Sequence, residues 1–255
     1  MTTAVAAQSR MISNDQWLSD LFGYSVFHLH VDSNEGPKAS EIRDHFEQHN
    51  RAFSYAKIDV ACTETLRELQ TVGFNVVDTN VVFSLNDGAK ESPALNTEQL
   101  VISEATNDDH ADVLQIAGSC FRQSRFHLDP SVPNNLANKI KREWIKNCLA
   151  ANRGDRVFVS RERGQVTGFL ASGLTRDSNQ TTAIIDLIGV GSAFQGRGIG
   201  MALCKAFIKN YSAKVDQLLV GTQIANLPSM RLYQKLGFNI IRSSYVLHKH
   251  VDFET

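Results

Sequence analysis

A glycine-rich segment near residue 195 has the residue types and spacing needed to bind an anion. The apolar run 184–190 leads into Gly196, Gly198 and Gly200, and an apolar helical pattern follows. Glycines leave successive backbone N–H groups unobstructed, and a helix that begins here adds positive potential at its first turn. Arg197 adds a charge-assisted donor. The segment therefore predicts a site for a phosphate or a diphosphate.

The spacing of these glycines excludes two common nucleotide-binding loops. A P-loop requires Lys followed by Ser or Thr after its last glycine, and a Rossmann turn requires G-x-G-x-x-G with an acidic residue ending the next strand. Neither requirement is met, and Asp216 precedes the next strand. The pattern that fits is Gln/Arg-x-x-Gly-x-Gly/Ala, formed by Gln195, Gly198 and Gly200. It resembles the pyrophosphate loop of the Gcn5-related N-acetyltransferases, which bind acetyl-CoA; a turn that only joins strand to helix is the alternative.

Residues 226–238 resemble a second signature of the same superfamily. Asn226 opens a short helical pattern that includes Tyr233 and ends at Gly237 and Phe238. The resemblance implies direct transfer of acetyl from acetyl-CoA to a neutral amine, with Tyr233 protonating the leaving thiolate. A phenol of ordinary pKa, about 10, is protonated at neutral pH and can donate. In the alternative, the Tyr233 ring packs beside its helical neighbours with the hydroxyl in water.

The resemblance also implies which residues bind coenzyme A. The backbone of the strand ending at Val190 would pair with the pantetheine amides, and the Val190 N–H would stabilise the oxyanion. Asn226 either caps the helix that follows it or bonds the cofactor. Asp186 is interpreted as an exposed strand carboxylate rather than a base. The expected cofactor-binding residues are Ile188, Gly189, Val190, Gln195, Gly196, Arg197, Gly198, Ile199, Gly200 and Asn226.

Three further segments narrow the resemblance to one family. Residues 121–126 (Phe-Arg-Gln-Ser-Arg-Phe), 143–147 (Glu-Trp-Ile-Lys-Asn) and 17–23 look like the TDP-fucosamine acetyltransferase family. Such enzymes acetylate the amine of a nucleotide-linked amino-deoxy sugar, which places Arg125, Phe126 and Gln223 at the acceptor. A protein or small-amine acceptor and a non-catalytic acyl-CoA sensor are the alternatives. The family also suggests a homodimer.

An internal repeat predicts two related α/β units. Residues 70–77 (QTVGFNVV) reappear as residues 234–241 (QKLGFNII), and each copy reads as a helix end, a glycine stop and a strand. Leu69 stands where the second copy has Tyr233, and the first copy lacks the glycine-rich loop. We therefore expect a mixed α/β acetyltransferase fold with a truncated, degenerate N-terminal copy over 1–95, a catalytic domain over 96–255, and a linker at 86–99.

Hydrophobic periodicity and turn residues predict the elements around these motifs. Between two of the helices, residues 121–138 form a long segment whose Phe126, Leu128 and Val132 favour ordered contacts. Strands are expected at 25–31, 53–60, 101–103, 156–160, 165–174, 182–190, 218–223 and 239–247, and helices at 39–50, 63–72, 108–120, 140–150, 198–211 and 227–236.

Composition excludes several classes of partner. The chain has 26 Lys and Arg residues and 27 Asp and Glu residues, so its formal net charge is -1. No overall excess of positive charge is therefore available to attract nucleic acid. No run approaches the ~20 apolar residues of a membrane span, and the N-terminus is too polar for a signal peptide, so we expect a soluble, cytoplasmic protein. The four cysteines lack CxxC spacing, and no Cys, Asp or Glu partner is evident for His28/His30 or His248/His250. His45 and His49 lack the H-E-x-x-H pattern and suit a solvated helix face. We therefore expect no metal.

Overall fold

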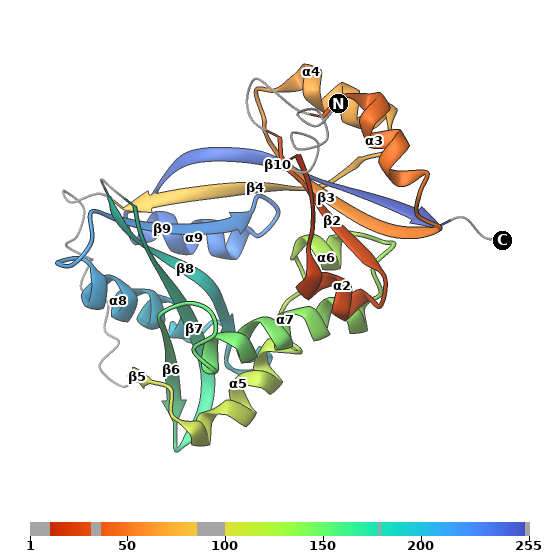
Figure 1. Ribbon diagram of the computed structural model, residues 1–255. Helices are drawn as coiled ribbons and strands as arrows, with labels where there is room; N and C mark the ends of the chain where they lie inside the picture. Colours follow the sequence, from red (N-terminus) through yellow and green to blue (C-terminus); the bar gives the residue numbers. More distant parts are fainter. Residues whose placement is uncertain (1–10, 32–36, 86–99, 178–179, 253–255) are drawn as a thin grey trace. The chain divides into compact units, whose positions relative to one another are not determined.

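The computed structural model describes residues 11–31, 37–85, 100–177 and 180–252 (Figure 1). The chain forms two compact units: unit 1 comprises residues 1–80, 124–136 and 242–255, and unit 2 comprises residues 81–123 and 137–241. The expected linker at 86–99, with the boundary between 95 and 96, lies outside the described residues. Within the described ranges, no helix is long and apolar enough to cross a bilayer.

The units differ from the expected domains because neither is one continuous segment. Residues 124–136 and 242–255 belong to unit 1, although the sequence places them in the catalytic domain. The reason is a nine-pair antiparallel ladder, in which residues 244–252 of the last strand pair with residues 51–59. That the first copy is a degenerate acetyltransferase stays a prediction.

Unit 1 is a sheet with helices on both faces. Its strand order is β1-β2-β3-β10, with β2 and β3 parallel and the outer pairs antiparallel. Helices α3 and α4 cover one face (Figure 1), where Ile42, Phe46 and Leu69 pack against the strands. The elements are β1 (Ile12–Asn14), α2 (Gln16–Phe22), β2 (Ser25–Leu29), α3 (Ala39–Phe46), β3 (Arg51–Asp59), α4 (Thr63–Thr71), α6 (Arg125–Leu128) and parts of β4 (Asn75–Leu85) and β10 (Asn239–Asp252).

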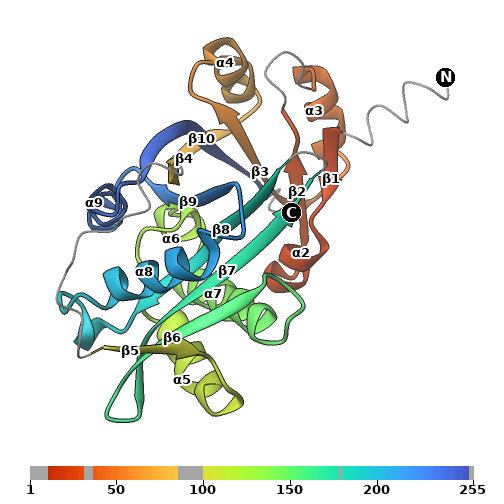
Figure 2. The same ribbon diagram turned by 90° about the vertical axis from the view of Figure 1, so that its left-hand side faces the viewer.

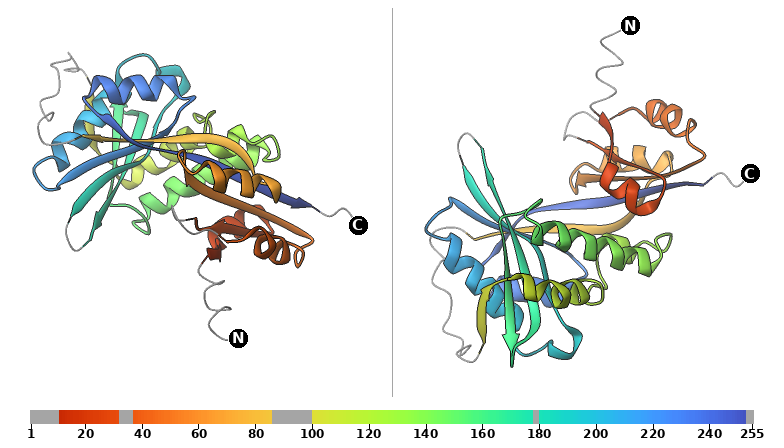
Figure 3. Two further views of the ribbon diagram at one scale, coloured as in Figure 1. Left: turned by 90° about the horizontal axis from the view of Figure 1, so that it is seen from above. Right: turned by 60° about the horizontal axis from the view of Figure 1, so that its bottom comes forward.

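Unit 2 is a sheet between two helical layers. The order is β9-β8-β7-β6-β5, with the end of β4 beside β9. One apolar core lies under α8 and α9 and the other under α5 and α7, on the opposite face (Figures 2 and 3). The elements are β5 (Val101–Glu104), η2 (Asn107–Asp109), α5 (His110–Ala117), α7 (Asn134–Leu149), β6 (Arg156–Glu162), β7 (Gln165–Arg176), β8 (Thr181–Val190), η3 (Ser192–Phe194), α8 (Ile199–Tyr211), β9 (Gln217–Gln223) and α9 (Leu227–Lys235).

Most predicted elements are confirmed to within a few residues, and two regions differ. The segment 121–138 is shorter than expected as a loop, because it holds α6 and because α7 begins at Asn134, directly after Pro133. As expected, Phe126 and Val132 are buried. Sequence patterning missed β1 and α2, which are too short to show a period; Asp15 caps α2 by accepting a hydrogen bond from the Leu18 N–H at 3.0 Å.

The two copies of the internal repeat form the same backbone hydrogen bonds where the helix ends and the strand begins. Gly73 and Gly237 have φ of +90° and +87°, the left-handed region that ends a helix. In both copies the N–H of the following phenylalanine donates 3.0 Å to the fifth residue back, which is Leu69 in one copy and Tyr233 in the other. The repeat is therefore structural, and it places a leucine where the second copy has its tyrosine.

Candidate functional site

Strands β8 and β9 stop pairing partway along their length in unit 2. They pair in parallel only from Thr182 with Gln217 to Ile185 with Val220, yet β8 continues to Val190 and β9 to Gln223. Along the described part of these strands, the edge of residues 186–190 that faces β9 has no ladder partner. Backbone N–H and C=O groups seek partners. The gap is therefore suited to an extended ligand with amide groups, as expected for pantetheine.

A β-bulge at Asp186 bends β8 at this point. On its other edge β8 pairs with β7, and the register shifts so that Ser172 opposes Ile185 while Ala171 opposes Leu187. Asp186 is the extra residue, which disrupts the ladder and increases the local twist. The bulge directs the last four residues of β8 away from β9 while they keep pairing with β7.

Gly189 fits between two side chains that would touch any larger residue. A Cβ at Gly189 would lie 2.8 Å from the Cys120 sulfur and 2.8 Å from the Phe169 ring. Burial raises the pKa of the Cys120 thiol to about 12, so the sulfur stays protonated. The backbone N–H groups of Cys120 and Val190 act in the opposite direction on this pKa. Cys120 and Phe169 thus fix the backbone of residues 188–190.

The glycine-rich loop presents backbone N–H groups at the start of α8. Gly196 and Gly198 have φ of +77° and +81°, and no atom lies within 4 Å of where a Cβ would stand at either. The helix that follows begins without a side-chain cap, so its first-turn N–H groups have no intrahelical acceptor. The Gln195 amide donates to the Val190 carbonyl at 3.2 Å and ties the loop to β8.

Arg197 is held loosely beside this loop. Its guanidinium donates to the Ala193 carbonyl at 3.0 Å and lies 3.4 Å from the Glu162 carboxylate, and the side chain is 54% exposed. An exposed ion pair contributes at most about 1 kcal/mol. Arg197 can therefore exchange Glu162 for a phosphate at little cost.

Tyr233 lies in the core of unit 2. It is 2% exposed, and its ring centroid is 5.7 Å from that of Phe83 and 6.1 Å from that of Phe238. Burial, with a smaller effect of Cys204, raises the pKa of Tyr233 above its usual range, while a hydrogen bond with Ser229 acts in the opposite direction. The ring packs in the core, as the alternative expects, but the water-exposed hydroxyl of that alternative is wrong. The role of Tyr233 as proton donor stays a prediction. The phenol is protonated at physiological pH, as a proton donor requires.

Asn226 caps α9, as one of its two expected roles requires. Its side-chain oxygen accepts a hydrogen bond from the Ser229 N–H at 3.4 Å, which satisfies one of the unpaired donors of the helix start. The amide nitrogen is not used in the cap. Gln223 ends β9 and is half-buried.

Asp186 is not the exposed strand carboxylate that the sequence predicts, and it is not an unpaired carboxylate that could act as a base. Its side chain is 15% exposed and pairs with the Arg153 guanidinium at 2.9 Å. The Trp144 indole N–H donates to the same carboxylate at 2.8 Å. The carboxylate is therefore neither a solvated surface group nor a free base. These three residues come from separate parts of the sequence, and no local pattern connects them.

The expected acceptor residues fall in different units. Gln223 lies in unit 2 with the cofactor-binding candidates, whereas Arg125 and Phe126 belong to unit 1. In unit 1 the Arg125 guanidinium carbon lies 4.0 Å from the Tyr55 ring centroid and 4.5 Å from that of Phe126. Two aromatic rings therefore hold this guanidinium in place.

Two of the histidines do have an acidic partner, contrary to expectation. The Asp129 carboxylate lies 2.6 Å from His248 Nδ1 and 2.8 Å from His250 Nε2, and the three ligand atoms lie within 4.8 Å of one another. Asp and His are metal-binding types, but these separations are those of direct hydrogen bonds. The expectation of no metal stays a prediction. The sequence missed the partner because Asp129 is more than a hundred residues away.

Burial decides the charge of His248. Burial lowers its pKa to about 4, although the Asp129 carboxylate acts in the opposite direction. Burial also raises the pKa of Asp129, but hydrogen bonds with both histidines outweigh it and hold that pKa well below its usual range. At neutral pH the cluster is therefore an ionised carboxylate with a neutral His248.

Comparison with known proteins identifies the family to which this geometry is similar. Residues 111–238, half of the chain, match the Acetyltransferase (GNAT) family. The chain is 32% identical over 141 residues to the spore coat polysaccharide biosynthesis protein SpsD of Bacillus subtilis (strain 168), a match that covers 55% of this chain and 47% of that protein. This chain therefore spans about half the length of its curated relative.

Solved structures show the same fold at low sequence identity. A functionally unknown conserved protein from Staphylococcus epidermidis has a TM-score of 0.59 at 14% identity, covering 91% of this chain and 87% of the other. A tandem GNAT protein from the clavulanic acid biosynthesis pathway has a TM-score of 0.57 at 11% identity, covering 90% and 76%. These likenesses establish a mixed α/β GNAT fold.

Two glycine-to-alanine substitutions should have opposite effects on stability. Gly189→Ala places a methyl group against Cys120 and Phe169 and should destabilise by about 1–3 kcal/mol. Gly200→Ala, in α8, meets only the Leu232 side chain at 3.4 Å and should stabilise by up to about 1 kcal/mol. Urea unfolding of both variants checks this; equal midpoints would contradict the proposed packing.

Acidification should destabilise the protein through His248. Its folded pKa of about 4 lies below the unfolded value of 6.5. The unfolded chain therefore takes up the proton first, and stability falls as the pH drops from 6.5 toward 4. Between pH 7 and 4.5 the loss is about 2 to 3 kcal/mol. Urea unfolding at both pH values should show a smaller loss in His248→Gln, and an unchanged loss in that variant would refute the assignment.

Proposed function

Because this chain belongs to the GNAT acetyltransferase family, whose members use acetyl-CoA, we propose that it acetylates the amino group of a nucleotide-linked amino-deoxy sugar. The proposal rests mainly on one observation: β8 and β9 stop pairing beside the glycine-rich loop. An unpaired strand edge next to a helix start offers sites for amides and for a diphosphate together. Coenzyme A contains both groups in one molecule.

The residues of unit 2 fit coenzyme A. The N–H groups at Gly196 to Gly200 and the Arg197 guanidinium would hold the diphosphate, and the backbone of residues 188–190 would hold the pantetheine amides. The open space above Gly196 and Gly198 supports this fit. Asn226 would use the amide nitrogen that its cap leaves unused. Acetyl-CoA supplies an acetyl group activated as a thioester.

The protein's own groups have two tasks in the transfer. The neutral acceptor amine forms the new C–N bond, the C–S bond breaks, and the amine loses one proton to solvent. The Val190 N–H would stabilise the oxyanion. Tyr233 donates the proton that the thiolate takes up. Asp186 is committed to Arg153 and Trp144, so the amine is deprotonated without it.

The sugar acceptor is supported by relatives rather than by geometry. SpsD is described as a spore coat polysaccharide biosynthesis protein, and the segments 121–126 and 143–147 resemble enzymes that act on nucleotide-linked amino sugars. A protein or small-amine acceptor and a non-catalytic acyl-CoA sensor are the competing outcomes. A homodimer and a cytoplasmic location stay predictions.

An assay of thiol release from acetyl-CoA distinguishes a sugar acceptor, another amine acceptor and a non-catalytic sensor. The purified protein is incubated with acetyl-CoA and, in separate reactions, with TDP-linked amino sugars, polyamines or a lysine peptide. The masses of the products are measured by mass spectrometry. Turnover confined to the nucleotide sugars supports the proposal. Turnover with another amine replaces the acceptor, and coenzyme A binding without any acetylated product would make the protein a sensor.

Tyr233→Phe should lower kcat by 10²- to 10⁴-fold, because it removes a positioned proton donor. Affinity for acetyl-CoA should stay within about twofold. Tyr211→Phe is the matched control, since Tyr211 is a buried tyrosine of the same core whose hydroxyl is bonded to Ser172 and Asp155. Its kcat, measured on folded enzyme, should be unchanged. Near-normal turnover of Tyr233→Phe would remove the proposed acid.

A further inference from the structure

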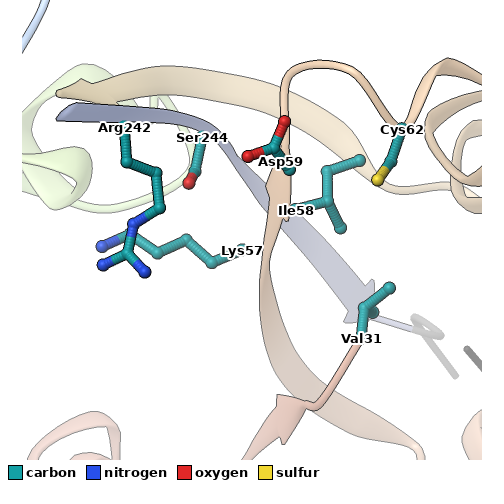
Figure 4. A pocket seen from close by; sticks show the side chains of 7 residues that line it. All are labelled: Val31, Lys57, Ile58, Asp59, Cys62, Arg242 and Ser244. Atoms are coloured by element: carbon teal, nitrogen blue, oxygen red, sulfur yellow. The ribbon is translucent and has the colours of Figure 1, made fainter. Parts of the chain in front are cut away.

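The sheet of unit 1 has a cavity on the face that carries Lys57. Register pairs Ser244 of β10 with Asp59 of β3 and Val246 with Lys57. Because residues opposite each other share a face, and alternate residues do as well, Lys57, Asp59 and Ser244 lie together. A cavity of about 330 Å³ opens there, lined by Lys57, Asp59, Cys62, Arg242, Ser244 and neighbouring apolar residues (Figure 4). Its volume is within the range of small-molecule sites.

Two cations, Lys57 and Arg242, line this cavity together with the Asp59 carboxylate. Figure 4 shows the Lys57 ammonium and the Arg242 guanidinium in the same part of the cavity as Ser244, and burial and then the charge of Arg242 lower the pKa of Lys57. Among the described residues, neither forms an ion pair within 4.0 Å. The Asp59 carboxylate lies apart from them and accepts the Ala61 N–H at 2.9 Å. Like charges held together repel, so the pair is poised to accept an anion.

A third cation acts on the same face. Tyr55 lies two residues before Lys57 on β3 and therefore on the same side of the sheet, and the Arg125 guanidinium stacks on its ring at 4.0 Å. Burial, and then the charges of Arg125 and Arg242, lower the pKa of Lys57, while Asp78 acts in the opposite direction. Both guanidinium groups therefore act electrostatically on the same ammonium, and the Asp78 carboxylate opposes them.

We propose that Lys57, Arg242 and Ser244 bind a phosphate or diphosphate group, with Arg125 adding positive potential. The ammonium supplies a point charge, the guanidinium a planar fork of donors, and the hydroxyl a neutral donor, which together match phosphate oxygens. A nucleoside diphosphate carries this chemistry, whether it is free or joined to a sugar, and the inference does not rest on the proposed function.

Calorimetry on the full-length protein tests the site with TDP as the probe and uncharged thymidine as its control. The wild type should bind TDP, with affinity that falls as salt rises, and thymidine should bind at least tenfold more weakly. Lys57→Gln/Arg242→Gln should weaken TDP binding at least tenfold. Arg51→Gln is the matched control in the same unit, since Arg51 pairs with Asp252 at the surface, and should bind TDP like the wild type.

Further measurements separate this inference from the proposed function. Coenzyme A binding by Lys57→Gln/Arg242→Gln should be unchanged. Unaltered TDP affinity in that variant overturns the site, whatever the enzyme activity. Coenzyme A binding with no TDP binding in the wild type also overturns the site and leaves the acetyltransferase intact. Absence of coenzyme A binding overturns the proposed function alone.

Discussion

The constraint on which the candidate site depends is that β8 and β9 stop pairing after Ile185 and Val220. A sheet interior normally satisfies its backbone groups with a neighbouring strand, and an unmet group costs about as much as a lost hydrogen bond. Unit 2 keeps one edge of β8 bonded to β7 through the Asp186 bulge and leaves the other edge to a ligand. Cys120 and Phe169, packed against Gly189, hold the open strand in shape.

The polar residues around this opening are largely committed to one another. Asp186 is bonded to Arg153 and Trp144, and the Asn226 oxygen closes the first turn of α9. What remains for a ligand is mainly backbone, together with Arg197, whose exposed ion pair is readily exchanged. If coenzyme A binds here as proposed, it is held mainly by backbone groups, which every residue type carries. The main requirement on the sequence is then glycine at positions where a side chain would obstruct the backbone.

Unit 1 is chemically different, since its candidate ligand groups are side chains. Among the described residues, Lys57, Arg125 and Arg242 form no ion pair within 4.0 Å, although Asp15 and Asp78 act electrostatically on Arg125. Asp129, by contrast, holds His248 and His250. These residues come from three distant parts of the chain, brought together because residues 124–136 and the end of β10 belong to this unit. Unit 1, whose copy of the repeat lacks the glycine-rich loop, therefore has a polar face to which later segments of the chain contribute.

The sequence alone determined the features that local interactions set. Glycine spacing, helix stops and apolar periods predicted the loop at 195–200, the turns at Gly73 and Gly237 and most of the longer elements, because each depends on neighbours a few residues away. Tertiary structure decided the pairing of Asp186, the burial of Tyr233, the acidic partner of His248 and the unit to which Arg125 belongs. Each of these depends on residues far apart in the chain, whose contacts are set by strand register and packing rather than by any local pattern.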